Sequence, residues 1–196
     1  MKIFFFLINV TCLISCNLSE RFKCTYWDES NVQTRIKQLK QRIDTIELKV
    51  YEDSTYKVKI VYPRCFYEYK TNEKRNEENI VHLKYDSYET HCQFDLYLNI
   101  WDNTERLEIK NAIELELENT KDSTTKCIEE NKDYFIISGR LGEYRSFVRK
   151  RFLLNNQWID YKLVYSNEGE EAISRVIQLV KEWDPNTALY NEAQDF

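Results

Sequence analysis

Residues 92–101 read CQFDLYLNIW, and this stretch decides the fold. Its apolar residues alternate with Gln93, Asp95, Tyr97, Asn99 and Trp101. Successive side chains of a strand point to opposite faces. The stretch therefore predicts a strand with one apolar face and one polar, aromatic face. Asp102, Asn103 or Thr104 can cap the start of a helix, and apolar residues follow at helical spacing over 107–117, which predicts a helix ending before Asp122.

Further strands are predicted on both sides of this stretch. One covers 56–63 and is closed by Pro63, and another covers 80–85. After the first helix, strands are expected at 134–138, 144–154 and 158–165, with turns at 139–143 and at Asn155–Asn156. A final helix follows Asn167, buries a stripe from Ile173 to Trp183, and stops at Pro185. Residues 51–185 are thus expected to form one α+β domain, an antiparallel sheet packed against helices, with a loose tail over 186–196.

A separate helix is predicted over residues 31–50. Its apolar residues recur in alternating steps of three and four, at Ile36, Leu39, Ile43, Ile46 and Val50. Two heptads are fewer than the three or four that indicate a coiled coil. Packing on the domain is the favoured interpretation, and self-association stays open, so the oligomeric state is not fixed.

The order of these elements resembles the PsbP-like fold, whose family includes an extrinsic photosystem II subunit and many exported bacterial proteins. The resemblance covers about residues 56–183. It is carried by 58–63, the Gly139 turn, 158–165 and the stripe over 173–183. It implies an architecture and no activity, because one fold hosts many functions.

The N-terminus resembles a bacterial lipoprotein signal peptide. Lys2 precedes an apolar run over 3–14, and the run ends on Leu13, Ile14, Ser15 and Cys16. The resemblance implies that residues 1–15 are a signal peptide, that Cys16 is lipidated, and that 16–30 form a lipidated tether. The protein would then be exported and anchored in the cell envelope, at the outer membrane or a membrane facing the periplasm. An ordinary secretory signal fits the same pattern, while a spanning helix needs about 20 apolar residues.

Four cysteines remain beyond Cys16: Cys24, Cys65, Cys92 and Cys127. An even number in an exported chain predicts two disulfides, and three connectivities are open. Cys65 follows one predicted strand and Cys92 opens another, which favours a bond between them. The alternative is that some are buried free thiols.

Composition excludes several classes of function. Formal net charge is −5 with both signs interspersed, so no basic footprint for nucleic acid is present. With 3 Gly and 2 Pro, the chain lacks the glycine-rich loops of nucleotide sites. The cysteines show no metal-knuckle spacing, and His91 cannot readily activate the adjacent Cys92 because neighbouring strand residues diverge. We therefore expect no enzyme, cofactor, metal site or catalytic residue.

The remaining candidate is a binding surface. Tyr97 and Trp101 lie on the polar face of the 92–101 strand, and Arg149 and Arg151 belong to a basic strand. Exposed aromatic and arginine side chains favour protein contacts. The sequence therefore predicts a membrane-tethered binding or structural module with a protein partner. The alternatives are a small ligand or glycan held in a pocket between sheet and helices, or an unrecognised envelope enzyme.

Overall fold

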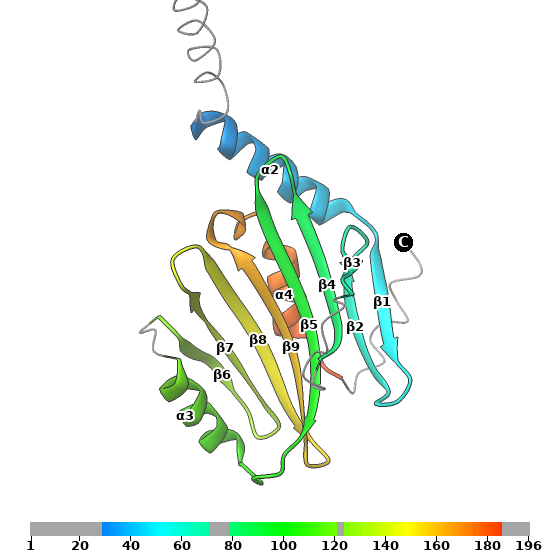
Figure 1. Ribbon diagram of the computed structural model, residues 1–196, viewed down its shortest axis with the longest axis vertical. Helices are drawn as coiled ribbons and strands as arrows, with labels where there is room; N and C mark the ends of the chain where they lie inside the picture. The colour runs from blue at the N-terminus through cyan, green and yellow to red at the C-terminus, as the bar shows by residue number, and fades with distance from the viewer. Residues whose placement is uncertain (1–28, 71–78, 121–123, 186–196) are drawn as a thin grey trace, which may run out of the picture. The chain divides into compact units, whose positions relative to one another are not determined.

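The computed structural model describes residues 29–70, 79–120 and 124–185 (Figure 1). The chain divides into two compact units, residues 1–35 and 36–196. The described part of the first unit, 29–35, is the start of helix α2 (Glu29–Thr45). All that follows concerns the second unit.

A seven-stranded antiparallel sheet forms the centre of this unit (Figure 1). Its strands lie in the order β3 (Tyr67–Glu68), β4 (Asn79–Ser87), β5 (Cys92–Asp102), β9 (Gln157–Ser166), β8 (Arg145–Leu154), β7 (Tyr134–Leu141) and β6 (Lys126–Glu130). The central neighbours β5 and β9 are far apart in sequence, so the middle of the sheet depends on long-range strand pairing. Between β8 and β9, Asn155 and Asn156 have φ values of 51° and 62°, which confirms the predicted two-residue turn.

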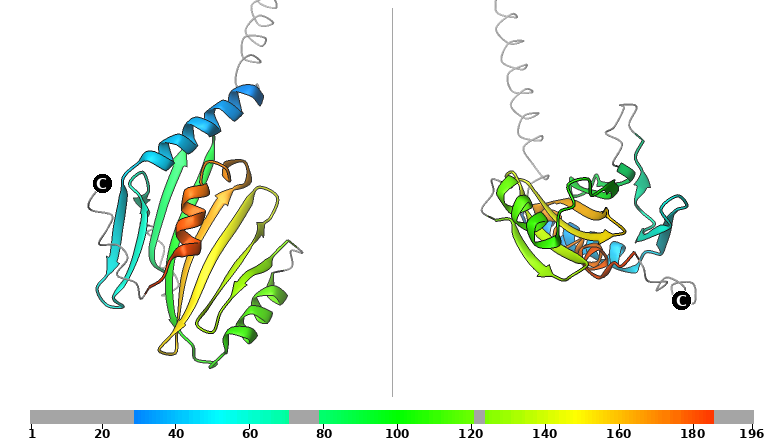
Figure 2. Two further views of the ribbon diagram at one scale, coloured as in Figure 1. Left: turned by 180° about the vertical axis from the view of Figure 1, so that it is seen from behind. Right: turned by 90° about the horizontal axis from the view of Figure 1, so that it is seen from below.

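Helix α4 (Ser174–Glu182) covers the apolar face of the sheet, as the view from behind shows (Figure 2). Its Val176 and Val180 are fully buried, as is Trp183 directly after it. The Trp183 ring packs edge-on against Phe152 of β8 and Tyr161 of β9, with ring centroids 5.5 and 5.3 Å apart. Burial of large aromatic rings dominates the energetics of such a core.

Helix α3 (Ile109–Asn119) packs on the opposite face, against β6 and β7. Its Ile109, Ala112 and Ile113 join a second buried cluster with Phe135 and Trp158 of the sheet. The helix covers only one end of this face, so the middle of the face carries other side chains.

A separate two-stranded sheet lies beside the main one (Figure 1). It consists of β1 (Leu48–Asp53) and β2 (Val58–Pro63). Two buried aromatic side chains bond to its backbone. The Tyr161 hydroxyl donates to Val61 O at 3.0 Å, and the Trp183 indole N–H donates to Lys59 O at 2.7 Å.

The structure confirms the α+β fold class and corrects several boundaries. The helix expected over 31–50 ends at Thr45, because residues 48–53 pair with β2 as a strand. Its Ile36, Leu39 and Ile43 are buried, so this part of the apolar stripe packs within the chain. Strands β3 and β6 were not predicted, and β7 runs through Gly139 to Leu141 instead of turning there.

Both predicted helix starts were also placed too early. Asn103 does not cap α3, which begins after Glu108; its side chain instead exchanges two hydrogen bonds with the backbone of Leu107. Asn167 opens a 3-10 turn, η1 (Asn167–Gly169), and α4 begins only at Ser174.

Candidate functional site

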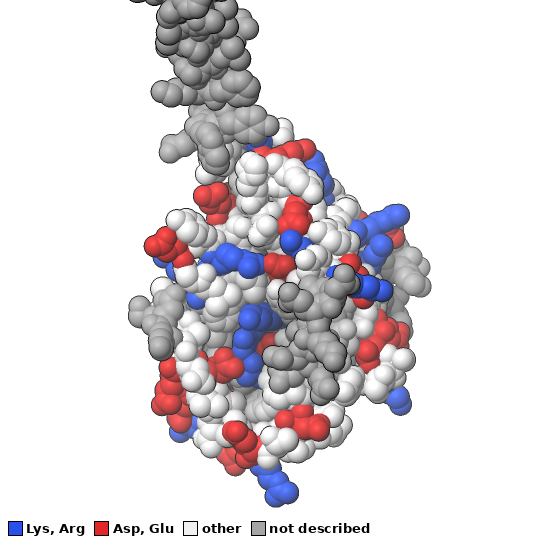
Figure 3. All heavy atoms as spheres, in the orientation of Figure 1, with Lys and Arg blue, Asp and Glu red and all other residues white. Residues whose placement is uncertain are grey.

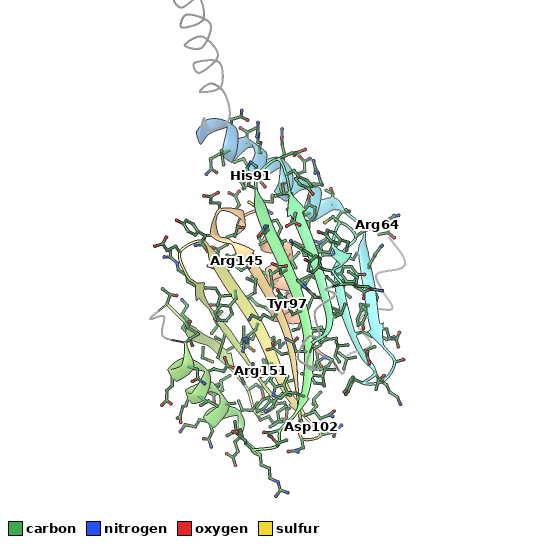
Figure 4. All side chains as sticks on the ribbon, viewed as in Figure 1. Arg64, His91, Tyr97, Asp102, Arg145 and Arg151 are labelled. Carbon is green, nitrogen blue, oxygen red and sulfur yellow. The ribbon has the colours of Figure 1, made fainter. Side chains whose placement is uncertain are left out.

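The face of the sheet opposite α4 is polar at its centre. Three neighbouring strands contribute to it in register. The row on β9 is Trp158, Asp160, Lys162 and Val164; it is flanked by Trp101, Asn99, Tyr97 and Asp95 of β5, and by Leu153, Arg151, Arg149 and Phe147 of β8. Lys and Arg side chains gather on this face in the space-filling view (Figure 3), and Tyr97, Arg145 and Arg151 are labelled on it in Figure 4.

Asp160 lies at the centre of an ion-pair network beneath this face. It is 2% exposed, and its Oδ1 lies 3.3 Å from Arg151 Nε and 3.7 Å from Arg149 Nε. Both arginines also pair with Glu116 of α3: Arg149 Nη1 lies 3.0 Å from Oε2, and Arg151 Nη1 lies 2.7 Å from Oε1. Burial raises the pKa of Asp160, but the positive charges of Arg149, Arg151 and Lys162 outweigh it and hold that pKa below its ordinary value. The network therefore stays ionised and fixes α3 on the sheet.

A second network surrounds Asp95. His82 Nε2 of β4 lies 2.8 Å from one oxygen of this buried carboxylate, and Arg145 of β8 pairs with the other. Burial raises the pKa of Asp95, but the hydrogen bond from His82 and the charge of Arg145 outweigh it and lower the pKa. The His82 ring stacks on Tyr97, with centroids 4.3 Å apart. This contact covers one face of the Tyr97 ring.

Lys162 lies beside these two networks but takes part in none of the ion pairs just described. Within the described part of the chain, no carboxylate lies within 4.0 Å of its ammonium, which sits 5.6 Å from the centroid of the Phe147 ring. Burial, and then the charge of Arg149, lower the pKa of Lys162 to about 8. Among the described residues, Arg145, Arg149 and Arg151 pair with three carboxylates, Asp95, Glu116 and Asp160, and Lys162 adds a fourth positive charge that these three do not balance.

The Lys162 side chain lines a hollow of about 270 Å³, which we call the lysine hollow. Its other lining residues are Tyr97, Asn99, Leu141, Arg145 and Val164. Among the described residues, Asn99 Oδ1, Arg145 Nε and Arg149 Nε are buried without a hydrogen-bond partner. Buried polar atoms are nearly always hydrogen-bonded. Two cationic side chains, Lys162 and Arg145, line this hollow beside one unpartnered acceptor, Asn99 Oδ1. The excess of positive charge is the feature that favours an anion there.

A second hollow of about 370 Å³ lies between α3 and the segment that follows β5. Trp101, Trp158, Arg151 and Glu116 are among its lining residues. The Arg151 guanidinium stands 4.8 Å from the Trp101 ring centroid, so this ring is engaged by a cation of the same chain. The charged groups of Arg151 and Glu116 in this second hollow already pair with each other, which makes the lysine hollow the better candidate for a ligand site.

The four residues predicted from sequence as a binding surface do share this face. Arg149 and Arg151, however, are not exposed: their side chains are 13% and 10% accessible, and both are bound in ion pairs. Sequence reasoning missed Lys162, Asn99 and Asp160 as site residues. The alternation over 158–165 places Lys162 and Asp160 on the face opposite the apolar residues of β9, and this pattern could have identified both as site residues.

The cysteines form no disulfide among the described residues. Cys65, Cys92 and Cys127 are free thiols, so the expected bond between Cys65 and Cys92 is not formed, and Cys24 lies outside the described residues. Burial raises the pKa of Cys65 to about 11 and also raises the pKa values of Cys92 and Cys127. Such thiols carry little thiolate and are poor nucleophiles.

No helix in 29–70, 79–120 or 124–185 is long and apolar enough to cross a membrane. In the same residues, no group of three or more His, Cys, Asp or Glu side chains is placed to hold a metal ion. Cys16, the predicted lipidation site, lies outside the described residues.

Comparison with known proteins adds a likeness of fold. No family model matches the chain, and no curated protein matches it. The structure is similar to the solution structure of cyanobacterial PsbP (CyanoP) from Synechocystis sp. PCC 6803, with a TM-score of 0.48 and 12% sequence identity. The match covers 69% of this chain and 89% of that chain. At this identity the likeness concerns the PsbP-like fold alone.

Proposed function

We propose that this protein is a binding module that holds a small anionic ligand in the lysine hollow. The observation that carries the proposal is the unbalanced ammonium of Lys162, which lines the hollow beside Arg145. An anion bound there would supply the missing negative charge. Arg145, whose side chain is 38% exposed, would add a second cation to the contacts of that anion.

The sequence left three interpretations, and this proposal is nearest to the small ligand in a pocket between sheet and helices, although strand residues alone line the lysine hollow. Contact with a protein through an open aromatic face has less support, because Tyr97 stacks on His82 and Trp101 on Arg151. A protein partner remains a prediction that rests on the sequence.

The test is calorimetric titration of the protein with propionate and with inorganic sulfate at pH 7. We expect binding to at least one of these anions, and we expect Lys162→Met to abolish it. Affinity should fall about tenfold between pH 7 and pH 9, because an ammonium with a pKa of about 8 is charged below that pH and mostly neutral one unit above it.

The matched control is Lys132→Met, which removes a surface ammonium whose side chain is 85% exposed. This variant should bind like the wild type. Equal loss of affinity in both variants would mean that the protein responds only to its net charge, and the site would be rejected.

We further propose that the module works outside the cytosol, anchored in the cell envelope by a lipid on Cys16. The support is the Lys2, apolar-run and Leu13–Cys16 pattern of the N-terminus. One acyl chain alone anchors a protein only marginally, at about 0.8 kcal/mol per buried methylene, so durable anchoring requires more than one chain. Mass analysis of the native N-terminus tests this: an acylated Cys16 supports the anchor, and a free Asn17 or an unmodified Cys16 refutes it.

A further inference from the structure

The surroundings of the Lys162 amine combine burial, neighbouring cations and an open hollow. On β9 it stands between Tyr97 of β5 and Arg149 of β8. The charged groups that act on it are Arg149, Arg151, Asp160 and Glu116. The two carboxylates are already bound by the two arginines. The amine therefore lies near two arginines, and both carboxylates that act on it are already paired with those arginines.

A lysine that is buried next to other cations is a nucleophile near neutral pH, because an appreciable fraction of it is the free amine. Lys150 shows why burial alone is not sufficient. Burial also lowers its pKa, but its ammonium donates a hydrogen bond to Lys181 O at 2.9 Å and lies over the Tyr134 ring, on the face that α4 covers. Lys162 instead lines an open hollow.

The hollow also offers a place for an acid group and for an apolar group. Arg145 is 38% exposed, and only one end of its guanidinium is taken by Asp95. Leu141, Val164 and the Tyr97 ring supply apolar surface. A ligand that carries an acid, a carbonyl and a short apolar part matches these three elements.

We propose that Lys162 captures an oxo acid, a small carboxylate that also bears a ketone or aldehyde, as a reversible imine. This inference rests on the proposed anion-binding function and narrows its ligand class. The neutral amine attacks the carbonyl carbon, so a C–N bond forms and the carbonyl oxygen takes a proton to give a carbinolamine. That proton comes from the nitrogen, which loses its one remaining proton as the hydroxyl departs as water, and a C=N bond results. Amine and carbonyl give imine and water, with no oxidant or reductant consumed.

The experiment traps this imine in the full chain. The protein is incubated with pyruvate at pH 7.5, sodium borohydride is added to reduce any imine to a stable secondary amine, and the modified lysines are mapped by peptide mass spectrometry. We expect labelling of Lys162 to exceed labelling of the exposed Lys132 on the order of tenfold, since a pKa of about 8 leaves an appreciable fraction of Lys162 as the free amine at pH 7.5. Lys162→Arg, which keeps the charge, should lose this label.

Acetone provides the control for the acid group. It carries the same ketone without a carboxylate, so it should label Lys162 several-fold less than pyruvate does. Equal labelling by acetone and pyruvate would overturn the role given to Arg145. Labelling spread evenly over surface lysines would overturn the imine itself.

Lactate separates this inference from the proposed function, because it has the acid of pyruvate but no carbonyl. Binding of lactate together with trapping of pyruvate at Lys162 supports both. Binding of lactate without trapping refutes the imine and leaves the anion site standing. Absence of trapping, together with absence of binding by lactate, propionate and sulfate, refutes both.

Discussion

At the scale of the residue, the buried ammonium of Lys162 lowers the stability of the folded protein. Its pKa is lowered to about 8 by burial and by Arg149, so the folded state disfavours its charged form. The unfolded chain has no such penalty, because the ordinary lysine pKa is about 10.4. Below pH 8 the protein therefore loses stability by keeping this ammonium protonated. Residues that reduce stability are typical of functional sites.

This argument predicts that Lys162→Met stabilises the unliganded protein. At pH 7 the free energy of unfolding should rise on the order of 1–2 kcal/mol, because methionine fills similar space without a charge. The wild type should gain stability as pH rises from about 8 toward 10.5, and the variant should lack this gain. Urea denaturation at a series of pH values measures both effects. A destabilised variant would show that Lys162 is a structural residue instead.

At the scale of the element, helix α2 is held by one side chain of α4. Arg175 Nη1 donates to Ile43 O, Asp44 O and Ile46 O, at 2.8, 2.8 and 3.0 Å. Carbonyls at a helix C-terminus have no partners within the helix and attract cations. Arg175 satisfies this end of α2 at the point where the chain turns into β1.

Arg175→Ala should therefore release the C-terminal turn of α2. We expect a loss of about 1.5–3 kcal/mol, the usual range for hydrogen bonds to a charged group, with faster amide exchange over residues 43–48. Arg140→Ala on the exposed end of β7 is the control and should change stability by less than about 0.5 kcal/mol. Unchanged exchange in the Arg175 variant would contradict this role.

The elements also show how far sequence alone reaches. Period-two alternation identified β5, β8 and β9, since each has one face against an apolar core. It missed β6, whose KCIEE sequence is exposed except at Cys127, and extended α2 through 48–50, where the helical and strand patterns overlap. For the site, alternation gives the face of Lys162. It does not give the pairing of β5 with β9, which brings Tyr97 and Asn99 beside it.

At the scale of the whole molecule, the sheet separates a dry face from a charged one. Leu96, Leu98 and Leu163 are fully buried on the side of α4, whereas the other side buries Asp95 and Asp160 in ion pairs. Buried pairs are screened little by salt. Their contribution to stability therefore depends mainly on the ionisation of the two carboxyl groups.

We accordingly expect acid, more than salt, to unfold the protein. Both carboxyl groups have lowered pKa values when folded, so their contribution is complete above the ordinary pKa of about 4 and is lost as pH falls toward the folded values. Asp160→Asn should lower stability at pH 7 by about 3–5 kcal/mol, because it leaves the arginines unpaired. It should also flatten the decline below pH 4.

Circular dichroism during acid titration checks this prediction. Asp133→Asn, at an exposed position paired only with Lys132, is the control and should keep the wild-type profile. An Asp160 variant with the wild-type decline below pH 4 would place the acid sensitivity elsewhere.

The hairpin of β1 and β2 shares no backbone ladder with the seven strands, and side chains such as Tyr161 and Trp183 bond to its backbone carbonyls. Opening it would break side-chain bonds and expose apolar surface while the large sheet remained intact. We therefore expect the hairpin to open separately from the large sheet. The hairpin is the one expected to exchange its amides first when the native state fluctuates.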